Sequence, residues 1–194
     1  MIGKAALLNV IAGTNRGLLA TEPQKQAILA AIANLEDFNP TPRPLSASDL
    51  LDGNSQLLYT TSKALLNLDR VPLNKLGQIY QCIRVQTSTV YNIAEISGLP
   101  TLEGLVSVAA KFEPCSERRL LVKFQRSIIG LQRLIGYKSP ADFIQQIEAG
   151  KKFTAIDFPI KSGQQQGWLD ITYIDNNLRI GRGNEGSVFV LSKA

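Results

Sequence analysis

Apolar and polar positions change their period along this chain, from a helical spacing at the start to strand alternation at the end. Apolar residues recur at helical spacing twice within residues 1–38, and the second series includes Ile28 and Ile32. Thr21 precedes that second series as a potential N-cap, with Gln24 at the capping-box position. The pattern predicts a helical hairpin that packs its two apolar stripes on the rest of the protein rather than on a membrane.

Beyond this hairpin the pattern favours strands. Three prolines and a short helical turn make residues 39–50 a linker, and residues 51–194 form the predicted main domain. Strands are expected at 56–60, 78–85, 89–95, 105–112 and 119–127, followed by three more after a Gly- and Gln-rich loop at 162–167; short helices are expected at 62–68 and 140–149. About eight strands suit an up-and-down barrel that holds one small ligand. The predicted class is therefore mainly β (α+β).

The last three strands are the most informative part of the pattern. Asp175-Asn176-Asn177 tolerates positive φ and closes the first turn, and residues 183–186 close the second. The final strand is apolar on both faces, with Phe189 opposite in direction to Val188. A strand with one solvated face would alternate, so this strand is predicted to be covered on both sides. It belongs to a barrel wall or to a sheet with helices on its back.

Composition excludes several functional classes. The chain has no His and two Cys among 194 residues, which removes the commonest general base and leaves too few ligands for a structural zinc site. No enzyme activity, metal or cofactor is predicted. Cys82 and Cys115 are expected to be buried thiols, although a bond between them stays open. No apolar run reaches the length of a membrane span, and no signal or transit peptide is recognised, which indicates a bacterial or an already processed chain.

Positive charge is concentrated in one stretch. Residues 104–156 hold nine basic and four acidic residues, which equals the whole net charge of +5. This stretch is either an ordinary solvated surface or an anion-binding one that faces lipid headgroups. Nucleic acid is disfavoured, because no exposed aromatic row or binding motif accompanies the charge. The candidate membrane or anion surface consists of Arg118, Arg119, Lys123, Arg126, Lys151 and Lys152.

A barrel site for an apolar ligand needs inward apolar side chains and a few polar anchors. About half of the strand aromatics should face inward by alternation. The candidate ligand-binding residues are Tyr59, Tyr80, Phe112, Phe124, Trp168, Asp170, Thr172, Tyr173, Arg179 and Phe189. Asp170 and Arg179 lie on neighbouring strands and form a sensible cross-strand ion pair, which is one interpretation. The other is an inward, unpaired Arg179 that holds a carboxylate or quinone oxygen.

Several runs occur together in a specific order. They are Leu51–Ser62 (LDGNSQLLYTTS), Gly77–Gln81 (GQIYQ), Val90–Asn92 (VYN), Val108–Glu113 (VAAKFE), Gly167–Asp175 (GWLDITYID) and Leu178–Leu191 (LRIGRGNEGSVFVL). Their order and spacing resemble the plastid-lipid-associated protein family, the fibrillins, from about Ile28 to the C-terminus. The resemblance implies a lipocalin-like barrel, and without a transit peptide a cyanobacterial type of member.

The resemblance also implies a function. It suggests a non-enzymatic protein at the thylakoid periphery or a lipid-droplet surface, in a cyanobacterium or a plastid. The implied ligands are carotenoids, prenylquinones or fatty acids, and the implied role is photoprotection or membrane maintenance. Two alternatives stay open: a bilin-handling lyase that uses Arg118, Arg119 and Arg126, or a coat protein without a specific ligand. The chain departs from the family pattern at Ser55, where a Trp usually closes the barrel floor beneath an Arg, for which Arg179 is the candidate.

Overall fold

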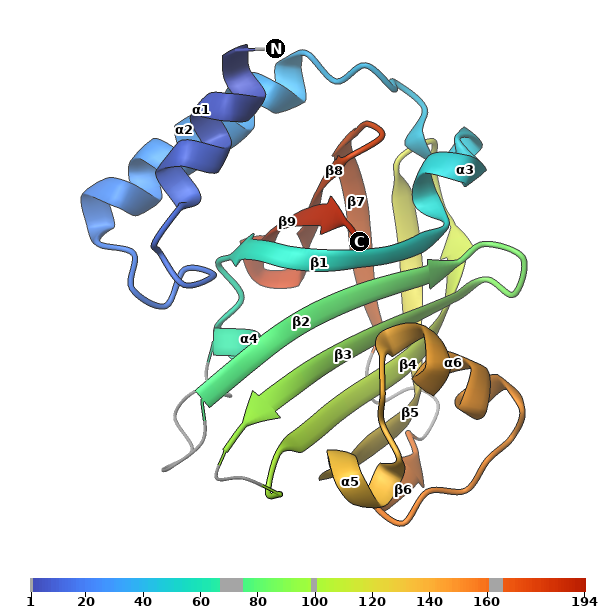
Figure 1. Ribbon diagram of the computed structural model, residues 1–194. Coiled ribbons are helices and arrows are strands. Elements are labelled where there is room, and N and C mark those ends of the chain that lie inside the picture. Colours follow the sequence, from blue (N-terminus) through green and yellow to red (C-terminus); the bar gives the residue numbers. More distant parts are fainter. Residues whose placement is uncertain (1, 67–74, 99–100, 161–165) are drawn as a thin grey trace.

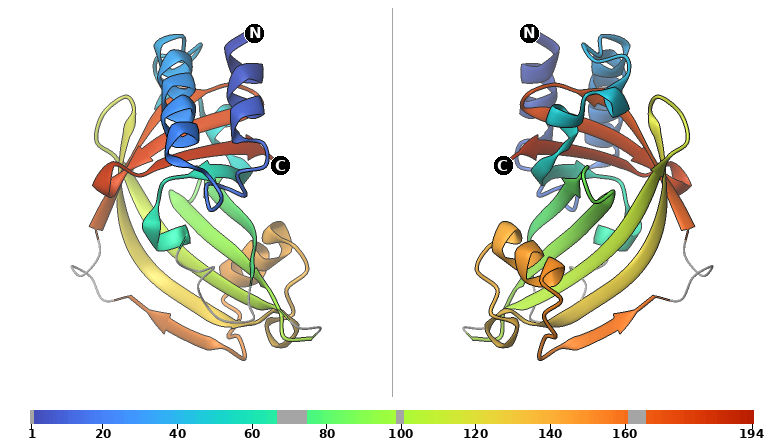
Figure 2. Two further views of the ribbon diagram at one scale, coloured as in Figure 1. Left: turned by 90° about the vertical axis from the view of Figure 1, so that its left-hand side faces the viewer. Right: turned by 90° about the vertical axis from the view of Figure 1, so that its right-hand side faces the viewer.

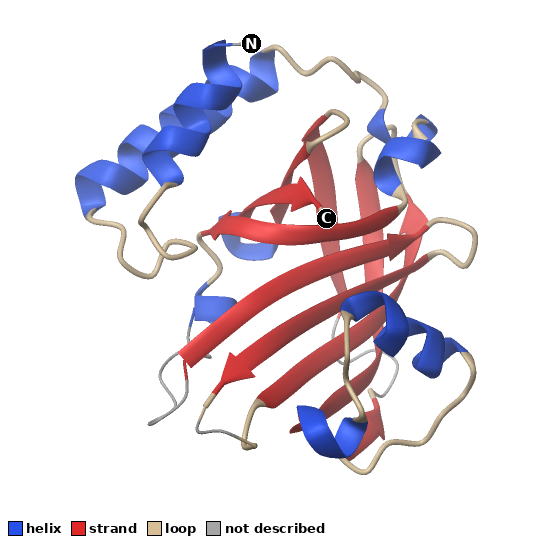
Figure 3. Cartoon of the chain, viewed as in Figure 1, coloured by secondary structure: helices blue, strands red, loops and turns tan. Residues whose placement is uncertain are grey.

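Within the described residues, eight antiparallel strands close into a barrel and a short ninth strand extends its wall (Figures 1 and 3). The computed structural model describes residues 2–66, 75–98, 101–160 and 166–194. The barrel order is β4-β3-β2-β1-β9-β8-β7-β5, and pairing of β4 with β5 closes it. The strands are β1 (Gly53–Thr60), β2 (Lys75–Arg84), β3 (Thr89–Ser97), β4 (Gly104–Pro114), β5 (Arg119–Leu131), β6 (Ile156–Pro159), β7 (Gln166–Ile174), β8 (Leu178–Gly183) and β9 (Val188–Lys193). The predicted barrel behind a helical hairpin is confirmed.

The hairpin consists of α1 (Ile2–Ile11) and α2 (Glu22–Asp37), and it lies against the outside of the terminal strands (Figures 1 and 2). The predicted capping box is present: the Thr21 hydroxyl accepts from the Gln24 N–H, and the Gln24 side chain accepts from the Thr21 N–H. One buried cluster joins the helices to the outer face of β1, β7, β8 and β9; it comprises Leu7, Ile11, Ile28, Ile32, Leu35, Tyr59, Tyr173, Leu178, Ile180, Val188 and Val190. We call this the hairpin cluster.

A second cover lies on the outside of β2 to β5. It is made by α5 (Gln132–Ile135) and α6 (Pro140–Glu148), and Figure 1 shows α6 in front of the sheet. Phe143 and Ile144 of α6 are buried against outward residues of these strands, including Tyr91 and Ile93. The prediction of a helix capped by Ser139 is confirmed, because the Ser139 side chain accepts from the backbone of its third helical residue. The four-residue α5 and β6 were not predicted.

Two apolar clusters fill the inside of the barrel. The first, the capped cluster, includes Ile83, Val90, Phe112, Leu120, Val122, Leu169, Ile171 and Ile174 and is closed by Leu51 of α3 (Ser48–Leu51) with the partly buried Leu45 and Leu50. The second, the mouth cluster, comprises Leu57, Leu76, Ile79, Ala94 and Leu191, with the partly buried Leu18, Leu65 and Val106. Phe189 packs against both. The barrel interior is therefore divided along its length between a capped part and an opposite part.

Strand β9 has apolar residues on both faces for a simple reason. Val188 and Val190 belong to the hairpin cluster on the outside, whereas Phe189 and Leu191 belong to the inner clusters. Both predicted settings are therefore present at once, a barrel wall and a sheet backed by helices. The remaining short elements are a 3-10 turn at Pro44–Ser46, α4 (Lys63–Leu66) and a 3-10 turn at Asn184–Gly186. No helix in the described part of the chain combines the length and apolar character needed to cross a membrane.

Three local predictions differ from the structure. The turn at 175–177 has no residue with positive φ; instead the Asp175 carboxylate accepts from the N–H groups of Asn177 and Leu178, each at 2.8 Å. Cys115 is exposed beyond the end of β4, so only Cys82 is a buried thiol, and both are free. The predicted loop at 162–167 falls largely outside the described residues, and its last residues belong to β7.

Candidate functional site

The strand register separates the predicted ligand-binding residues into two groups. Phe112, Phe124, Arg179 and Phe189 face the inside of the barrel, as their paired neighbours and the inner clusters show. Tyr59, Tyr80, Trp168, Asp170 and Tyr173 face outward, and Thr172 is the extra residue of a β-bulge that donates to the Ile180 carbonyl. Only the first group can therefore line the interior.

Arg179 is the most unusual residue inside the barrel. Its side chain leaves β8 beside Leu191 and is only 4% exposed. Its Nη2 donates to the Gln81 carbonyl at 3.5 Å, and Nη1 has no hydrogen-bond partner among the described residues. Burial lowers the pKa of Arg179 to about 10, and the charge interaction with Cys82 acts in the opposite direction. Arg179 is still a cation at neutral pH, and the neighbouring described residues compensate its charge poorly.

The expected ion pair between Asp170 and Arg179 is wrong. Asp170 lies opposite Arg182 in the β7–β8 register and faces outward, where it pairs instead with Arg119 of β5 at 2.6 and 2.7 Å. In the part of the chain that the structure describes, no carboxylate forms a salt bridge with Arg179. The second interpretation, an inward and unpaired arginine, agrees with the geometry.

Polar side chains form a layer between the two inner clusters at the level that Arg179 reaches. Ser55, Gln81 and Asn92 lie in register on β1, β2 and β3, and the Gln81 amide donates to the Asn92 side chain at 3.1 Å. On β2, Gln81 stands between Ile79 of the mouth cluster and Ile83 of the capped cluster. We call Ser55, Gln81, Asn92 and Arg179 the polar layer. Ser55 is small, so no large ring covers this layer from that position of β1.

The inner wall beside the polar layer keeps accessible surface. Gln81, Asn92, Val106, Phe124 and Phe189 are each only partly buried although their side chains face inward. Ile129, paired with Val106 and facing the same side, is 39% exposed. These residues are mostly apolar, with the amides of the polar layer as exceptions. Surface of this kind is what a long apolar ligand with a polar end contacts.

The outward residues have structural contacts of their own. The Arg119 guanidinium stacks on the Trp168 ring at 4.4 Å while it pairs with Asp170, so these three residues form one unit on the outside of β5 and β7. Tyr59 and Tyr173 are 1% exposed within the hairpin cluster, and the Tyr173 hydroxyl donates to Asp175 at 2.8 Å. Tyr80 packs against the cluster beneath α6.

The predicted basic surface is partly neutralised by ion pairs. Beside the Arg119 pair, Lys123 contacts Glu113 at 3.1 Å, and Arg126 holds Asp157 of β6 through two bonds of 2.7 and 2.6 Å. Arg118, Lys151 and Lys152 are exposed. The six residues spread from the β4–β5 turn to the segment after α6, so they do not form one compact binding face.

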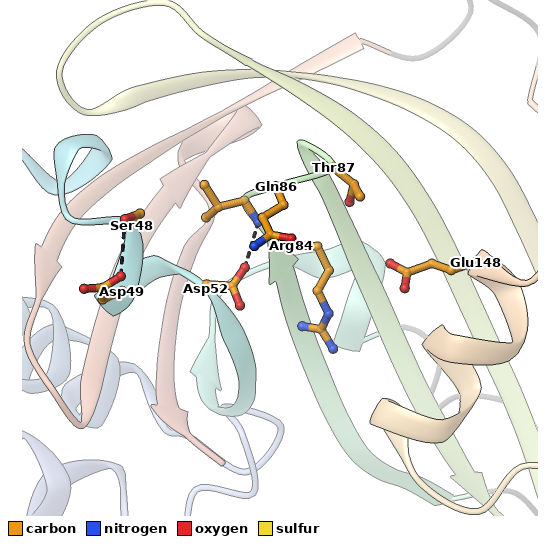
Figure 4. Close-up of a pocket in the computed structure, with 8 residues that line it drawn as sticks. Ser48, Asp49, Asp52, Arg84, Gln86, Thr87 and Glu148 are labelled. Atoms are coloured by element: carbon orange, nitrogen blue, oxygen red, sulfur yellow. Dashed lines mark hydrogen bonds between the residues drawn. The ribbon is translucent and has the colours of Figure 1, made fainter.

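A polar cleft of about 720 Å³ lies outside the barrel, between α3, the β2–β3 turn and the end of α6 (Figure 4). Its charged groups are Asp49, Asp52, Arg84 and Glu148. Asp52 accepts from the Val85 N–H at 2.8 Å, and Arg84 donates to Asn54 at 2.9 Å. The described residues contain no cluster suited to a metal ion. This cleft was not predicted, and most of the side chains that line it are polar or charged.

Comparison with known proteins agrees with the barrel and its helical hairpin. The PAP_fibrillin family matches residues 1–192. The chain belongs to this family. The resemblance that the sequence motifs indicated is thereby confirmed, and it extends over the helices as well as the barrel. No solved structure matches this family member.

Several curated relatives cover nearly the whole chain. A light-induced chloroplastic protein of Solanum tuberosum is 35% identical over 98% of the chain, and a chromoplast-specific carotenoid-associated protein of Cucumis sativus is 36% identical over the same share. A plastid-lipid-associated chloroplastic protein of Citrus unshiu is 33% identical. The chain spans 66% of the Solanum protein and 67% of the other two. All three relatives are named for a plastid, and the Cucumis and Citrus proteins are also named for association with carotenoid and with lipid, respectively.

Proposed function

We propose that this fibrillin is a non-enzymatic lipid-associated protein that binds an apolar small molecule inside its barrel. The observation that carries the proposal is the partly accessible, largely apolar inner wall beside the polar layer. Removal of apolar surface from water contributes about 25 cal/mol per Å², so a long hydrocarbon chain can be held with few hydrogen bonds. Family membership and the names of the relatives support a carotenoid, a prenylquinone or a fatty acid as the ligand.

The proposed location is the surface of thylakoids or lipid droplets, in a plastid or a cyanobacterium, with a role in photoprotection or membrane maintenance. Exposed apolar side chains of the N-terminal segment support contact with lipid: Leu8 is 39% exposed, Leu19 67% and Phe38 81%. The same observation favours the second candidate, a coat protein without a specific ligand. The bilin-lyase alternative gains no support, because Arg119 and Arg126 already pair with Asp170 and Asp157.

Extraction of the bound ligand distinguishes the carrier function from the function of a coat protein without a specific ligand. The full chain, purified from its native source without detergent, should carry a stoichiometric apolar molecule that mass spectrometry identifies. The protein freed of ligand should then take up a carotenoid, a prenylquinone or a fatty acid from phosphatidylcholine vesicles. Vesicle binding without uptake of any of the three would leave the coat function and remove the carrier function.

A further inference from the structure

The burial of the Arg179 cation costs free energy, and the fold alone does not explain why this residue is present. A buried cation with one hydrogen bond at the distance limit and one nitrogen without a partner loses most of its hydration and regains little. An apolar side chain would fill this inward position, as Leu191 and Ile174 do at the neighbouring strand positions. An anionic ligand that contacts the guanidinium would compensate this charge.

The geometry of the guanidinium indicates what that group is. Arginine presents its donors in a planar fork that matches a carboxylate through two parallel bonds. The other residues of the polar layer, Ser55, Gln81 and Asn92, offer only hydroxyl and amide groups, so the layer has a positive charge and no negative one. A single anionic carboxylate would accept a hydrogen bond from Nη1 and would also balance the positive charge of Arg179.

Polarity along the barrel indicates where the rest of the ligand lies. On one side of the polar layer the capped cluster is closed by Leu45, Leu50 and Leu51. On the other side Val106 and Ile129 retain accessible apolar surface. A molecule with its polar end at Arg179 would therefore meet accessible apolar side chains on this side of the layer, toward the mouth cluster.

We propose that Arg179 binds the carboxylate end of a long-chain apolar acid, whose tail lies along the mouth-cluster side of the inner wall. The proposal rests on the proposed function, since it names the ligand class of that same site. It distinguishes apolar acids from neutral apolar ligands, such as an ester or a hydrocarbon carotenoid.

The test compares palmitate with methyl palmitate, which share the same tail and differ in the head, an anionic carboxylate in one and a neutral methyl ester in the other. Each is offered to the full chain from phosphatidylcholine vesicles, and the protein-bound fraction is measured after the vesicles are removed. The wild type should bind palmitate at least about tenfold more tightly than the ester, the range expected for hydrogen bonds to a charged group. Arg179→Met should abolish the preference, and Arg179→Lys should retain part of it.

Arg133→Met is the matched control, because Arg133 is exposed on α5 and its removal changes the net charge equally. It should leave the preference intact. Equal binding of acid and ester by the wild type, or an unchanged preference in Arg179→Met, overturns the assignment of Arg179 and leaves the carrier function standing. Displacement of palmitate by an equal concentration of acetate overturns the role of the tail. If the wild type binds neither probe and also no carotenoid or prenylquinone, the carrier function itself fails.

Discussion

Replacement of Arg179 by Met should make the free protein more stable. Burial lowers the pKa of Arg179 on folding from its ordinary value to about 10. At about 1.36 kcal/mol per pKa unit, the folded state disfavours the cation by about 3 kcal/mol. The folded pKa lies below the unfolded one, so this penalty is complete at every pH below about 10 and declines only as pH rises above that value.

The net effect follows from what Met loses and gains. Met gives up the bond to the Gln81 carbonyl, which at 3.5 Å contributes at most about 1 kcal/mol, and it packs beside Leu191. The expected gain is about 2 kcal/mol, or roughly 4–8 °C in melting temperature for a chain of this length. Thermal unfolding followed by circular dichroism, with a urea titration at pH 7, measures it on ligand-free protein.

Arg182 supplies the control for this stability prediction. It lies on the same strand but faces outward, and it pairs with Glu36 of α2 through two bonds of 2.8 and 2.6 Å. Arg182→Met should therefore lower stability, by up to about 1 kcal/mol for a partly exposed pair. If Arg179→Met melts well below the wild type, Arg179 has a structural role and the physical basis for a ligand anchor is lost.

Three further predictions test the arrangement around the barrel. Burial alone would raise the pKa of Asp175, but the bonds from Lys4, Asn177, Tyr173 and Leu178 outweigh it and lower the pKa to about 2. The pKa of this carboxyl in the unfolded chain is 3.8, so the resulting stabilisation of about 2 kcal/mol is present above pH 4 and is lost as pH falls through 2. Urea titrations should show that Asp175→Asn removes this stabilisation. Trp168 faces outward, so Trp168→Phe should leave ligand affinity unchanged. If Phe124→Trp is then added to that variant, a bound carotenoid should quench the tryptophan fluorescence. Exposed Cys115 should react rapidly with a thiol reagent, whereas burial raises the pKa of Cys82 to about 11 and should delay its reaction until unfolding.

The sequence was sufficient for the architecture because local signals agreed with each other. The capping box at Thr21 and the two apolar faces of β9 each have a local physical cause that the fold retains. The four-residue α5 and β6 were missed because elements this short have no readable period.

Side-chain direction was the harder problem, and two bulges explain why. The register shifts between Leu57 and Tyr59 and between Ile171 and Tyr173, and each shift reverses the alternation that follows. Both tyrosines therefore face the hairpin rather than the interior. Asp170 found its partner on β5, a strand distant in sequence, which no hairpin argument between β7 and β8 could reveal.

The hairpin cluster also limits how this protein can meet a lipid surface. Ile180, Val188 and Val190 are at most 1% exposed beneath the helices, and the Lys4–Asp175 and Arg182–Glu36 pairs fasten each helix to the barrel. Swinging the hairpin onto a membrane would expose the outer apolar face of β8 and β9 and break both pairs. Each fully buried aliphatic side chain contributes about 1.5–3 kcal/mol, so this opening would cost more than lipid contact by the helix stripes returns. Contact with lipid should therefore use the outward residues of a closed hairpin, and a disulfide designed between α2 and β7 should leave vesicle binding intact.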